Sequence, residues 1–348
     1  MAVVKWRGEG RREICLELEK TRGGSVLRIL IYGGGAVGLG IASCLLRFGD
    51  WVDIVAREKT IGALKRDGLV RTGIFGDYSA NPDEFGSYSS LEDLPEESYD
   101  YVLVCTKSHD SLEAAKDLLS RTTLLGDVGK IVLFQNGWGN AEIFAARFPK
   151  ERVYSARVIT GFQRPKPNVV EVTVHADSIH IGSLFGNDLA FMEPLSRSID
   201  QGGIPCQVVP NVERDLWAKM LYNCALNPLG AIFNVRYGVL GECTYTRSIM
   251  EEVIKEIFVV MGAHGYNTHW DSADDYISAF YELLLPPTQE HESSTLQDLR
   301  ARKTTEIEAL SGAIIRLGEN ANIPTPYNFM LYKMVKFLEG RNFREGGT

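Results

Sequence analysis

Residues 26–38 read VLRILIYGGGAVG. The apolar run 26–32 has the length and composition of a buried parallel strand, and it leads directly into the pattern G-x-G-x-x-G at 33–38. Apolar residues then recur at helical spacing over 39–48, and 51–56 again has the composition of a strand. The stretch therefore predicts a strand, a glycine-rich loop, a helix and a second strand, which together begin a βαβ unit.

The three glycines of this loop have different physical uses. Gly33 permits a tight turn, Gly35 lets the backbone approach a pyrophosphate, and Gly38 allows the helix to pack closely on the strand. The helix that follows offers its unpaired N–H groups and the positive end of its dipole to phosphates, and Ala36 and Val37 are expected to bind the cofactor as well. We therefore interpret the loop as a dinucleotide-binding site, with a ligand-free glycine turn as the alternative.

The residue after the second strand bears on which dinucleotide is bound. An acidic side chain there favours NAD by binding the ribose 2′-hydroxyl, whereas an arginine suits the 2′-phosphate of NADP. Here Arg57 follows the strand, with Lys59 just beyond, and Asp53 lies too early in the strand to reach the ribose. The sequence predicts NADP(H), unless Arg57 is only a solvated loop charge.

Strands alternate with helices up to about residue 208. Strands expected at 101–105 and 130–134 flank a helix expected at 112–125, and this alternation is typical of a doubly wound parallel sheet. Residues 169–181 instead alternate apolar and polar side chains. That pattern indicates an antiparallel addition, a hairpin at the edge of the sheet.

Helical spacing dominates the second half of the chain. The predicted fold class is α/β, with an N-terminal Rossmann-like doubly wound parallel sheet and a C-terminal all-helical domain. We expect an N-terminal extension at 1–25, an NADP-binding Rossmann-like domain at 26–208 and a helical domain at 209–348. Helices in the last domain are expected at 213–226, 246–264, 271–284 and 296–320.

Composition and charge narrow the function classes. The 348 residues carry a net charge of −8, which disfavours a nucleic-acid binder, and no apolar run approaches the roughly 18 residues of a membrane span. The six cysteines are scattered without CxxC spacing, so we expect no metal site and a reducing, cytoplasmic compartment. Residues 1–25 lack the apolar core of a secretory signal.

The segment 213–228 carries the strongest chemical signal. Lys219, Asn223 and Asn227 are spaced at i, i+4 and i+8, so they share one face of the expected helix. A lysine with two amides suits the lining of a polar cleft, and a buried lysine is costly unless it has partners or a function. The alternative is a solvent-exposed polar face, although the neighbouring residues are mostly apolar.

Several further motifs follow one another along the chain. They are Gly33-x-Gly35-x-x-Gly38, Arg57, Val104-Cys-Thr-Lys107, Gln135-Asn136-Gly137, Trp217-x-Lys219-x-x-x-Asn223-x-x-x-Asn227-Pro228, Ser293-Ser294-Thr-Leu-Gln-Asp298 and Thr305-Glu306-Ile307. Together, over about residues 27–340, they resemble the ketopantoate reductase (2-dehydropantoate 2-reductase) family. The resemblance implies a homodimeric enzyme that reduces a small 2-oxo acid, ketopantoate, with NADPH for pantothenate and coenzyme A synthesis.

The resemblance also implies roles for individual side chains. Lys219 looks like the proton donor to the forming alkoxide, and Asn136 matches a residue that touches both cofactor and substrate. Lys107 matches a lysine that positions both molecules, and Glu306 matches a carboxylate near the cofactor. A cationic acid near a carbonyl stabilises developing negative charge and then donates its proton. Substrate-binding positions match at Asn223, Asn227 and Ser294.

Two of these residues also have purely structural interpretations. Glu306 falls at the edge of the apolar face of the expected helix 296–320, where it is either partly desolvated or a plain surface acid. Ser294 and Gln297 have the spacing of a capping box, so Ser294 is expected to cap a helix, bind substrate or do both.

Two positions depart from the family pattern. Phe162 replaces a small residue beside the cofactor, and Tyr237 falls where a substrate-binding asparagine is usual. Both changes bear on the substrate more than on NADP-linked reduction. A second hypothesis is therefore an NADPH-dependent reductase of another small 2-oxo acid. A third is a non-catalytic NADP-binding sensor, which the joint presence of Lys219, Asn136 and Glu306 disfavours.

Overall fold

The computed structural model describes residues 26–345, so the expected extension at 1–25 lies outside the described residues. The described chain divides into two compact units. An N-terminal unit comprises 26–135 and 141–212, and a C-terminal unit comprises 136–140 and 213–345. No helix within 26–345 is long and apolar enough to cross a membrane.

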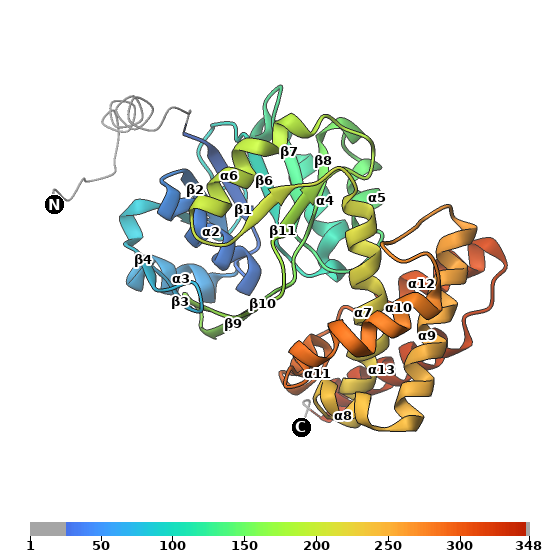
Figure 1. The fold of residues 1–348 in the computed structure, drawn as a ribbon. Helices are drawn as coiled ribbons and strands as arrows, with labels where there is room; N and C mark the ends of the chain where they lie inside the picture. Colours follow the sequence, from blue (N-terminus) through green and yellow to red (C-terminus); the bar gives the residue numbers. More distant parts are fainter. Residues whose placement is uncertain (1–25, 346–348) are drawn as a thin grey trace. The chain divides into compact units, whose positions relative to one another are not determined.

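The N-terminal unit is built on an eight-stranded sheet of order β12-β11-β8-β7-β6-β1-β2-β5 (Figure 1). Neighbouring strands pair in parallel throughout, except that β11 is antiparallel to β8. The strands are β1 (Arg28–Tyr32), β2 (Trp51–Val55), β5 (Gly86–Tyr88), β6 (Tyr101–Val104), β7 (Lys130–Leu133), β8 (Val153–Arg157), β11 (Ile179–Gly182) and β12 (Cys206–Val208).

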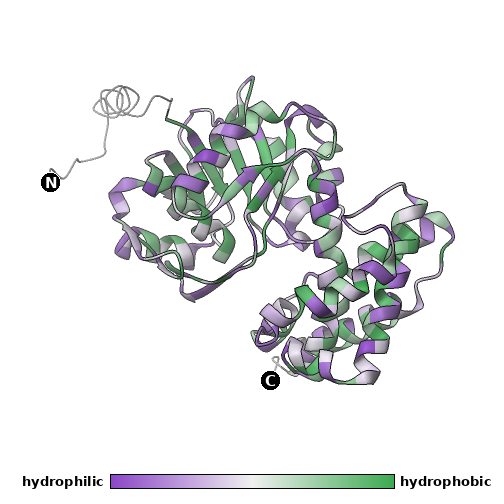
Figure 2. Ribbon diagram, viewed as in Figure 1, coloured by the Kyte–Doolittle hydropathy of each residue, from purple (hydrophilic) through white to green (hydrophobic). Residues whose placement is uncertain are grey.

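Strand β1 contributes to two hydrophobic cores, one on each face of this sheet. Ile29 and Ile31 belong to the core that contains helices α2 (Ala36–Phe48) and α6 (Glu193–Gln201). Leu30 belongs to the core that contains α4 (Ser111–Ser120) and α5 (Asn140–Ala145). Side chains alternate across a strand, so helices cover both faces, and hydrophobic colour follows the central strands in Figure 2. The doubly wound α/β prediction is confirmed.

A second, four-stranded sheet of order β4-β3-β10-β9 packs against helix α2. The antiparallel pairing expected at 169–181 is confirmed, but the single edge hairpin is wrong, because this segment is divided between the two sheets. Its first part, β10, pairs antiparallel with β9 and parallel with β3, whereas its last part is β11 of the larger sheet. Alternating polarity identifies a half-buried strand but not its partner. The strands are β3 (Leu69–Gly73), β4 (Tyr78–Ala80), β9 (Thr160–Lys166) and β10 (Val169–His175).

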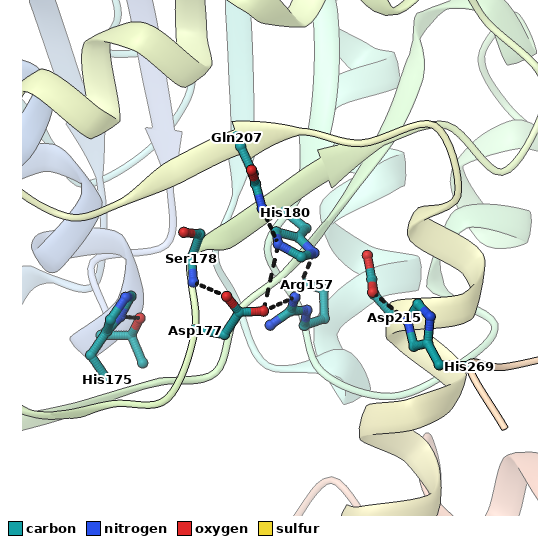
Figure 3. Close-up of polar contacts among 9 residues, drawn as sticks. Arg157, His175, Asp177, Ser178, His180, Gln207, Asp215 and His269 are labelled. Atoms are coloured by element: carbon teal, nitrogen blue, oxygen red, sulfur yellow. Dashed lines mark hydrogen bonds and ion pairs between the residues drawn. The ribbon is translucent and has the colours of Figure 1, made fainter.

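A polar cluster joins β8, β11 and β12 at the antiparallel edge (Figure 3). Nη2 of the buried Arg157 lies 2.8 Å from Oδ2 of Asp177 and 2.5 Å from Nδ1 of His180. A guanidinium can only donate, so Nδ1 of His180 accepts, and Nε2 of the same ring lies 2.6 Å from the side-chain amide of Gln207. The cluster pairs the buried guanidinium of Arg157 with a carboxylate and an imidazole where the sheet changes from parallel to antiparallel.

The C-terminal unit is all-helical. Its first helix, α7 (Val212–Phe233), contains Pro228 and ends where Asn234 adopts a left-handed φ of 58° and the N–H of Val235 bonds to the carbonyl of Gly230. This is the backbone pattern of a Schellman motif. The remaining helices are α8 (Tyr237–Glu242), α9 (Thr244–Ala263), α10 (Ala273–Ala279), α11 (Ser294–Arg300), α12 (Ser311–Ala321) and α13 (Pro326–Glu345), with a π-helical turn at Phe280–Leu284.

The helix expected at 296–320 is not continuous. Helix α11 ends before Arg302, whose φ of 53° is left-handed, and residues 301–310, hereafter the Glu306 segment, are not helical. This segment is instead held by α13, because Oε1 of Glu339 accepts hydrogen bonds from the backbone N–H and Oγ1 of Thr305 at 2.7 and 2.6 Å. Local apolar spacing cannot reveal such a bond, since its partners are 34 residues apart.

The expected capping box at Ser294 and Gln297 is also wrong. The N-cap of α11 is Ser293, whose Oγ accepts from the N–H of Leu296 at 3.0 Å. Gln297 instead donates to the carbonyl of Glu292 at 3.1 Å. Both serines have the chemistry of an N-cap, and the buried Ser293 takes the position because its Oγ also donates to helix α7.

Candidate active site

The glycine loop, residues 33–38, joins β1 to α2 in the N-terminal unit. Gly33 has a φ of +115°, and a Cβ on it would lie 2.7 Å from the backbone nitrogen of Thr106. A Cβ on Gly38 would lie 2.0 Å from the carbonyl oxygen of Gly33. Gly35 differs, because the nearest atom to a Cβ there is the carbonyl oxygen of Cys105 at 3.8 Å. Close contacts within the fold therefore require glycine at positions 33 and 38, whereas at position 35 there is room for a side chain or a ligand.

The loop leads into a helix N-terminus that suits an anion. Gly35 is the N-cap of α2 and offers no side chain to the first turn, in which no acidic residue stands. The backbone N–H groups at the start of a helix have no acceptor inside the helix, and those of Ala36, Val37 and Gly38 carry the positive end of its dipole. The residues present therefore fit the pyrophosphate of a dinucleotide, both in donors and in the space at Gly35.

The charged side chains in and just after β2 include an exposed cation and a half-buried acid. Arg57 is the N-cap residue of helix α3 (Glu58–Asp67), and it is exposed. Asp53 is turned away toward the neighbouring strand, since its Oδ2 accepts from the hydroxyl of Tyr99 at 2.7 Å and a Cβ on Gly86 would meet its Oδ1. Beyond β2, the exposed charged side chains are therefore Arg57, Glu58 and Lys59, and Arg57 comes first in the chain.

Two other candidates of this unit follow β6 and lie on β9. Lys107 is half-buried and precedes the short 3₁₀ turn Ser108–Asp110. Next to it, the amide of Gln135 donates to Oγ1 of Thr106 at 3.2 Å and to the carbonyl of Lys107 at 3.3 Å. The ring of Phe162 lies against α2, because a Cβ on Gly40 would be 2.4 Å from its Cε1. Phe162 thus packs against the helix beyond the glycine loop.

Three candidates converge in the C-terminal unit, to which residues 136–140 belong. Nζ of Lys219, on α7, donates to Oδ1 of Asn136 at 2.5 Å. Nδ2 of the same amide donates to Oε2 of Glu306 at 3.2 Å. Asn136 therefore stands between a cation and a carboxylate, and its two contacts fix which end of the amide faces the lysine.

Backbone bonds hold the asparagine and the carboxylate together. The N–H of Trp138 donates to the carbonyl of Ala309 at 2.8 Å, and Gly137 has a φ of +87° with Ala309 where a Cβ would stand. Glu306 is only 5% exposed, which rules out the plain surface acid considered from the sequence. Its position comes from the irregular Glu306 segment, and the helical placement expected for it is wrong.

The remaining candidates lie around the second half of α7. Asn223 is half-buried, whereas Asn227 is 3% exposed and its Oδ1 accepts from the hydroxyl of Tyr237 at 2.5 Å. Burial raises the pKa of Tyr237 well above 10, so this hydroxyl remains a neutral donor. Ser294 is half-buried at the first residue of α11. The tyrosine therefore occupies the acceptor oxygen of Asn227 and leaves the Nδ2 group as a donor.

Sequence reasoning missed three residues that organise these sites. Ser293 donates to the carbonyl of Asn227 at 3.2 Å, Glu339 holds the Glu306 segment, and Arg164 contacts the glycine loop. Ser293 is part of the motif Ser293-Ser294-Thr-Leu-Gln-Asp298, and its position next to Ser294 is the only feature of the sequence that points to its role. The other two act on segments far from them in the chain, where neither spacing nor composition gives a signal.

Known proteins share this architecture along nearly the whole chain. The family model described as "Ketopantoate reductase PanE/ApbA" matches residues 29–186, and "Ketopantoate reductase PanE/ApbA C terminal" matches 211–339. The 2-dehydropantoate 2-reductase of Aquifex aeolicus is 36% identical over 321 residues, which are 92% of this chain and 99% of that protein. The one of Archaeoglobus fulgidus is 30% identical over 318 residues, 90% of this chain and 98% of that protein.

Solved structures give the same result. A PanE/ApbA family ketopantoate reductase from Ralstonia eutropha JMP134 has a TM-score of 0.78 at 28% identity, covering 91% of this chain and 99% of that one. D-mandelate dehydrogenase, solved with NADH and anilino(oxo)acetate, has a TM-score of 0.80 at 21% identity over 91% and 99% of the two chains, which shows a shared fold. The chain therefore belongs to the ketopantoate reductase family of NAD(P)-dependent oxidoreductases.

Proposed function

We propose that this enzyme reduces 2-dehydropantoate to pantoate with NADPH, in the synthesis of pantothenate and coenzyme A. In this reaction the carbonyl carbon of the 2-oxo acid gains a hydride and its oxygen gains a proton. The nicotinamide supplies the hydride when the cofactor is bound. The glycine loop and the N-terminus of α2 would hold its pyrophosphate, with Arg57 at the adenosine ribose and Lys107, Asn136, Phe162 and Glu306 as further contacts.

The observation that carries the proposal is the contact series from Lys219 through Asn136 to Glu306. The ammonium of Lys219 stabilises negative charge on the carbonyl oxygen and then donates its proton there. Asn136 holds the ammonium in place, since its Oδ1 accepts from Nζ while Glu306 accepts from its Nδ2. A carboxylate at the far end of the amide keeps the oxygen end toward the lysine, so the proton donor is pre-oriented.

Substrate binding falls to the polar residues around α7. Asn223, Asn227, Tyr237 and Ser294 are proposed to contact the 2-oxo acid, and the half-buried Asn223 and Ser294 are the more accessible of them. Because Oδ1 of Asn227 already accepts from Tyr237, we propose that this amide binds substrate through its N–H donors. Donors suit the carboxylate or carbonyl oxygens of a 2-oxo acid.

The test is oxidation of NADPH followed by its absorbance, with 2-dehydropantoate and a panel of other 2-oxo acids, and with NADH in parallel. We expect turnover of 2-dehydropantoate to exceed that of the other acids, and NADPH to be preferred over NADH. Turnover of 2-dehydropantoate no faster than that of the panel would contradict the substrate. Equal use of NADH would contradict the cofactor preference alone.

A second candidate function is reduction of a different small 2-oxo acid by the same chemistry. The bond between Tyr237 and Asn227 favours it, because a buried aromatic side chain stands where the family usually has a substrate-binding asparagine. The relative D-mandelate dehydrogenase, crystallised with anilino(oxo)acetate, acts within the same fold. The panel therefore includes aryl 2-oxo acids, and a Tyr237→Asn variant is expected to shift kcat/KM toward 2-dehydropantoate if this candidate is right.

We also propose that the enzyme is a homodimer and that it works in the cytoplasm, where cysteines such as Cys44 and Cys243 remain free thiols. An apolar strip on α13 supports the dimer, because Met330 is 58% and Phe337 is 68% exposed. Exposed apolar surface of this kind is typical of protein interfaces. Light scattering tests the assembly: Phe337→Asp should convert a dimer to a monomer, and a monomeric wild-type protein would contradict the proposal.

A further inference from the structure

Arg164 lies on strand β9, on the side of the strand that is turned toward helix α2. Phe162, two residues earlier on the same strand, packs its ring against Gly40 of α2. Arg164 extends toward the start of α2, where its Nη1 donates to the carbonyl of Gly34 at 2.7 Å. A side chain of the second sheet therefore contacts the glycine loop directly.

The same guanidinium contacts the helix that follows β2. Its Nη1 donates to Oγ1 of Thr60 at 3.2 Å, and the buried Thr60 donates its backbone N–H to the carbonyl of Arg57 at 2.8 Å. The loop and this helix are in close contact, because a Cβ on Gly34 would lie 2.6 Å from the Cβ of Ala56. Arg57 and Arg164 thus belong to one corner, formed by the glycine loop and the first turn of α3.

This corner holds two cations without a compensating acid. Among the residues the structure describes, neither Arg57 nor Arg164 forms an ion pair with a carboxylate, although Glu58 follows Arg57 in the chain. Partial burial lowers the pKa of Arg164, and the charge of Arg57 lowers it further. Arginine nevertheless remains charged in proteins, so the two guanidinium groups repel each other. A bound anion would replace this repulsion by two attractions.

We propose that Arg164 is a specificity-determining residue that binds the 2′-phosphate of NADPH together with Arg57. The inference rests on the NADPH preference proposed above. The protein anchors Nη1 of Arg164, which leaves the N–H groups on Nε and Nη2 to donate to phosphate oxygens. Anchoring also orders the side chain before the ligand arrives, so less side-chain entropy is lost on binding.

A purely structural role makes a different prediction. If Arg164 only fastened β9 to the glycine loop, its loss would disturb the whole loop and weaken every adenine nucleotide alike. If it binds the 2′-phosphate, its loss weakens only ligands that carry that group. Adenosine 2′,5′-bisphosphate and AMP separate the two cases, because they differ only in the presence of a phosphate on the 2′-oxygen.

The experiment is calorimetric titration of the full-length protein with these two probes, without substrate or turnover. We compare wild type with Arg164→Met and Arg57→Met, and with Lys166→Met as a control that removes an exposed cation from the same strand. We expect wild type to prefer the 2′,5′-bisphosphate and each arginine variant to bind it about tenfold more weakly. Binding of AMP should change less than about twofold, which also reports that the variants are folded.

Three results would overturn the inference. Arg164→Met could keep the wild-type preference while Arg57→Met loses it, which leaves the NADPH proposal intact. Arg164→Met could weaken both probes equally, which assigns the residue a structural role. A wild-type protein without any preference for the 2′,5′-bisphosphate contradicts the NADPH proposal itself, and the inference fails with it. Arg164→Lys, which keeps the charge but not the fork of donors, should recover only part of the preference.

Discussion

The glycine loop and the Glu306 segment are both irregular, but different forces determine their shapes. The loop is shaped by backbone sterics among neighbours in one βαβ unit, as the 2.0 Å approach between a Cβ on Gly38 and the carbonyl of Gly33 illustrates. The Glu306 segment is shaped by side chains far away in sequence, through Glu339 and Asn136. A conformation fixed by local sterics tolerates changes elsewhere, whereas one fixed by distant partners is lost when a single partner is removed.

The largest effect is expected from removing Lys219, which the Glu306 segment positions through Asn136. Lys219→Ala should lower kcat about 1,000-fold, the middle of the range for loss of a general acid, while leaving NADPH affinity unchanged. Steady-state kinetics and direct NADPH titration measure the two quantities. Lys255→Ala, on an exposed position of α9, is the control and should match wild type. Undiminished turnover by Lys219→Ala would overturn the proposed mechanism.

The next effect tests the steric origin of the loop. Gly38→Ala places a methyl group against the Gly33 carbonyl and should destabilise the fold by about 1–3 kcal/mol through overpacking. Gly62→Ala is the matched control, because no atom lies within 4 Å of a Cβ there and alanine is the better helix former. Chemical denaturation measures both variants. Equal stability of the two would show that contacts other than these shape the loop.

A third, smaller effect tests the long-range support of the Glu306 segment. Glu339→Ala leaves the buried N–H and Oγ1 of Thr305 without their acceptor, at a cost of about 1–3 kcal/mol. We expect kcat to fall about tenfold as Glu306 loses its position, with a smaller loss of NADPH affinity because Glu306 is one of several proposed cofactor contacts. Glu339→Gln keeps an acceptor oxygen and should recover most of the activity, and Glu319→Ala, on the exposed side of α12, should have no effect.

That prediction fails in two recognisable ways. If kcat is unchanged in Glu339→Ala although the variant is less stable, Glu339 supports the fold but not the position of Glu306. If Glu339→Gln is as slow as the alanine variant, the charge rather than the acceptor geometry matters, since Oε2 of Glu339 also pairs with Lys336.

The smallest expected effect is a pH dependence of stability in the C-terminal unit. Burial lowers the pKa of His291 below its usual 6.5, although Glu292 partly opposes the shift. As the pH falls through 6.5, His291 is protonated in the unfolded chain but not yet in the folded chain. The stabilising contribution of neutral His291 is therefore complete above that pH and decreases below it. The melting temperature falls between pH 7.5 and 5.5, and we expect this fall to be about 1–2 °C smaller in a His291→Gln variant than in wild type. An unchanged drop would contradict this assignment.

These differences explain what could be predicted from the sequence. The strand, loop and helix at 28–48 follow from local spacing, because the glycines and the apolar run are adjacent in the chain. The shared face of Lys219, Asn223 and Asn227 also follows from spacing alone, since all three lie on the single helix α7. Structural features that are determined within one helix, strand or turn can be predicted from the residues of that element.

What sequence reasoning missed depends on partners distant in the chain. The apolar spacing around Glu306 fits a helix, yet Arg302 adopts a left-handed conformation and Glu339 binds the residue before Glu306. The alternation at 169–175 correctly indicates a strand, but its pairing with β3, about 100 residues earlier, is not encoded locally. Arg164 likewise looks like an ordinary strand cation until Gly34 is seen beside it.

Gly35 has a consequence for how this chain can vary. Its φ of −78° is open to any residue, and the nearest atom to a Cβ is 3.8 Å away. In a library of variants sorted by abundance in cells, Gly35→Ala should therefore score as neutral, unlike Gly33→Ala or Gly38→Ala. In the same library sorted by growth that depends on the reductase, all three should be depleted. A Gly35→Ala variant that is neutral in the first selection and depleted in the second would show that this glycine is required for ligand binding and not for folding.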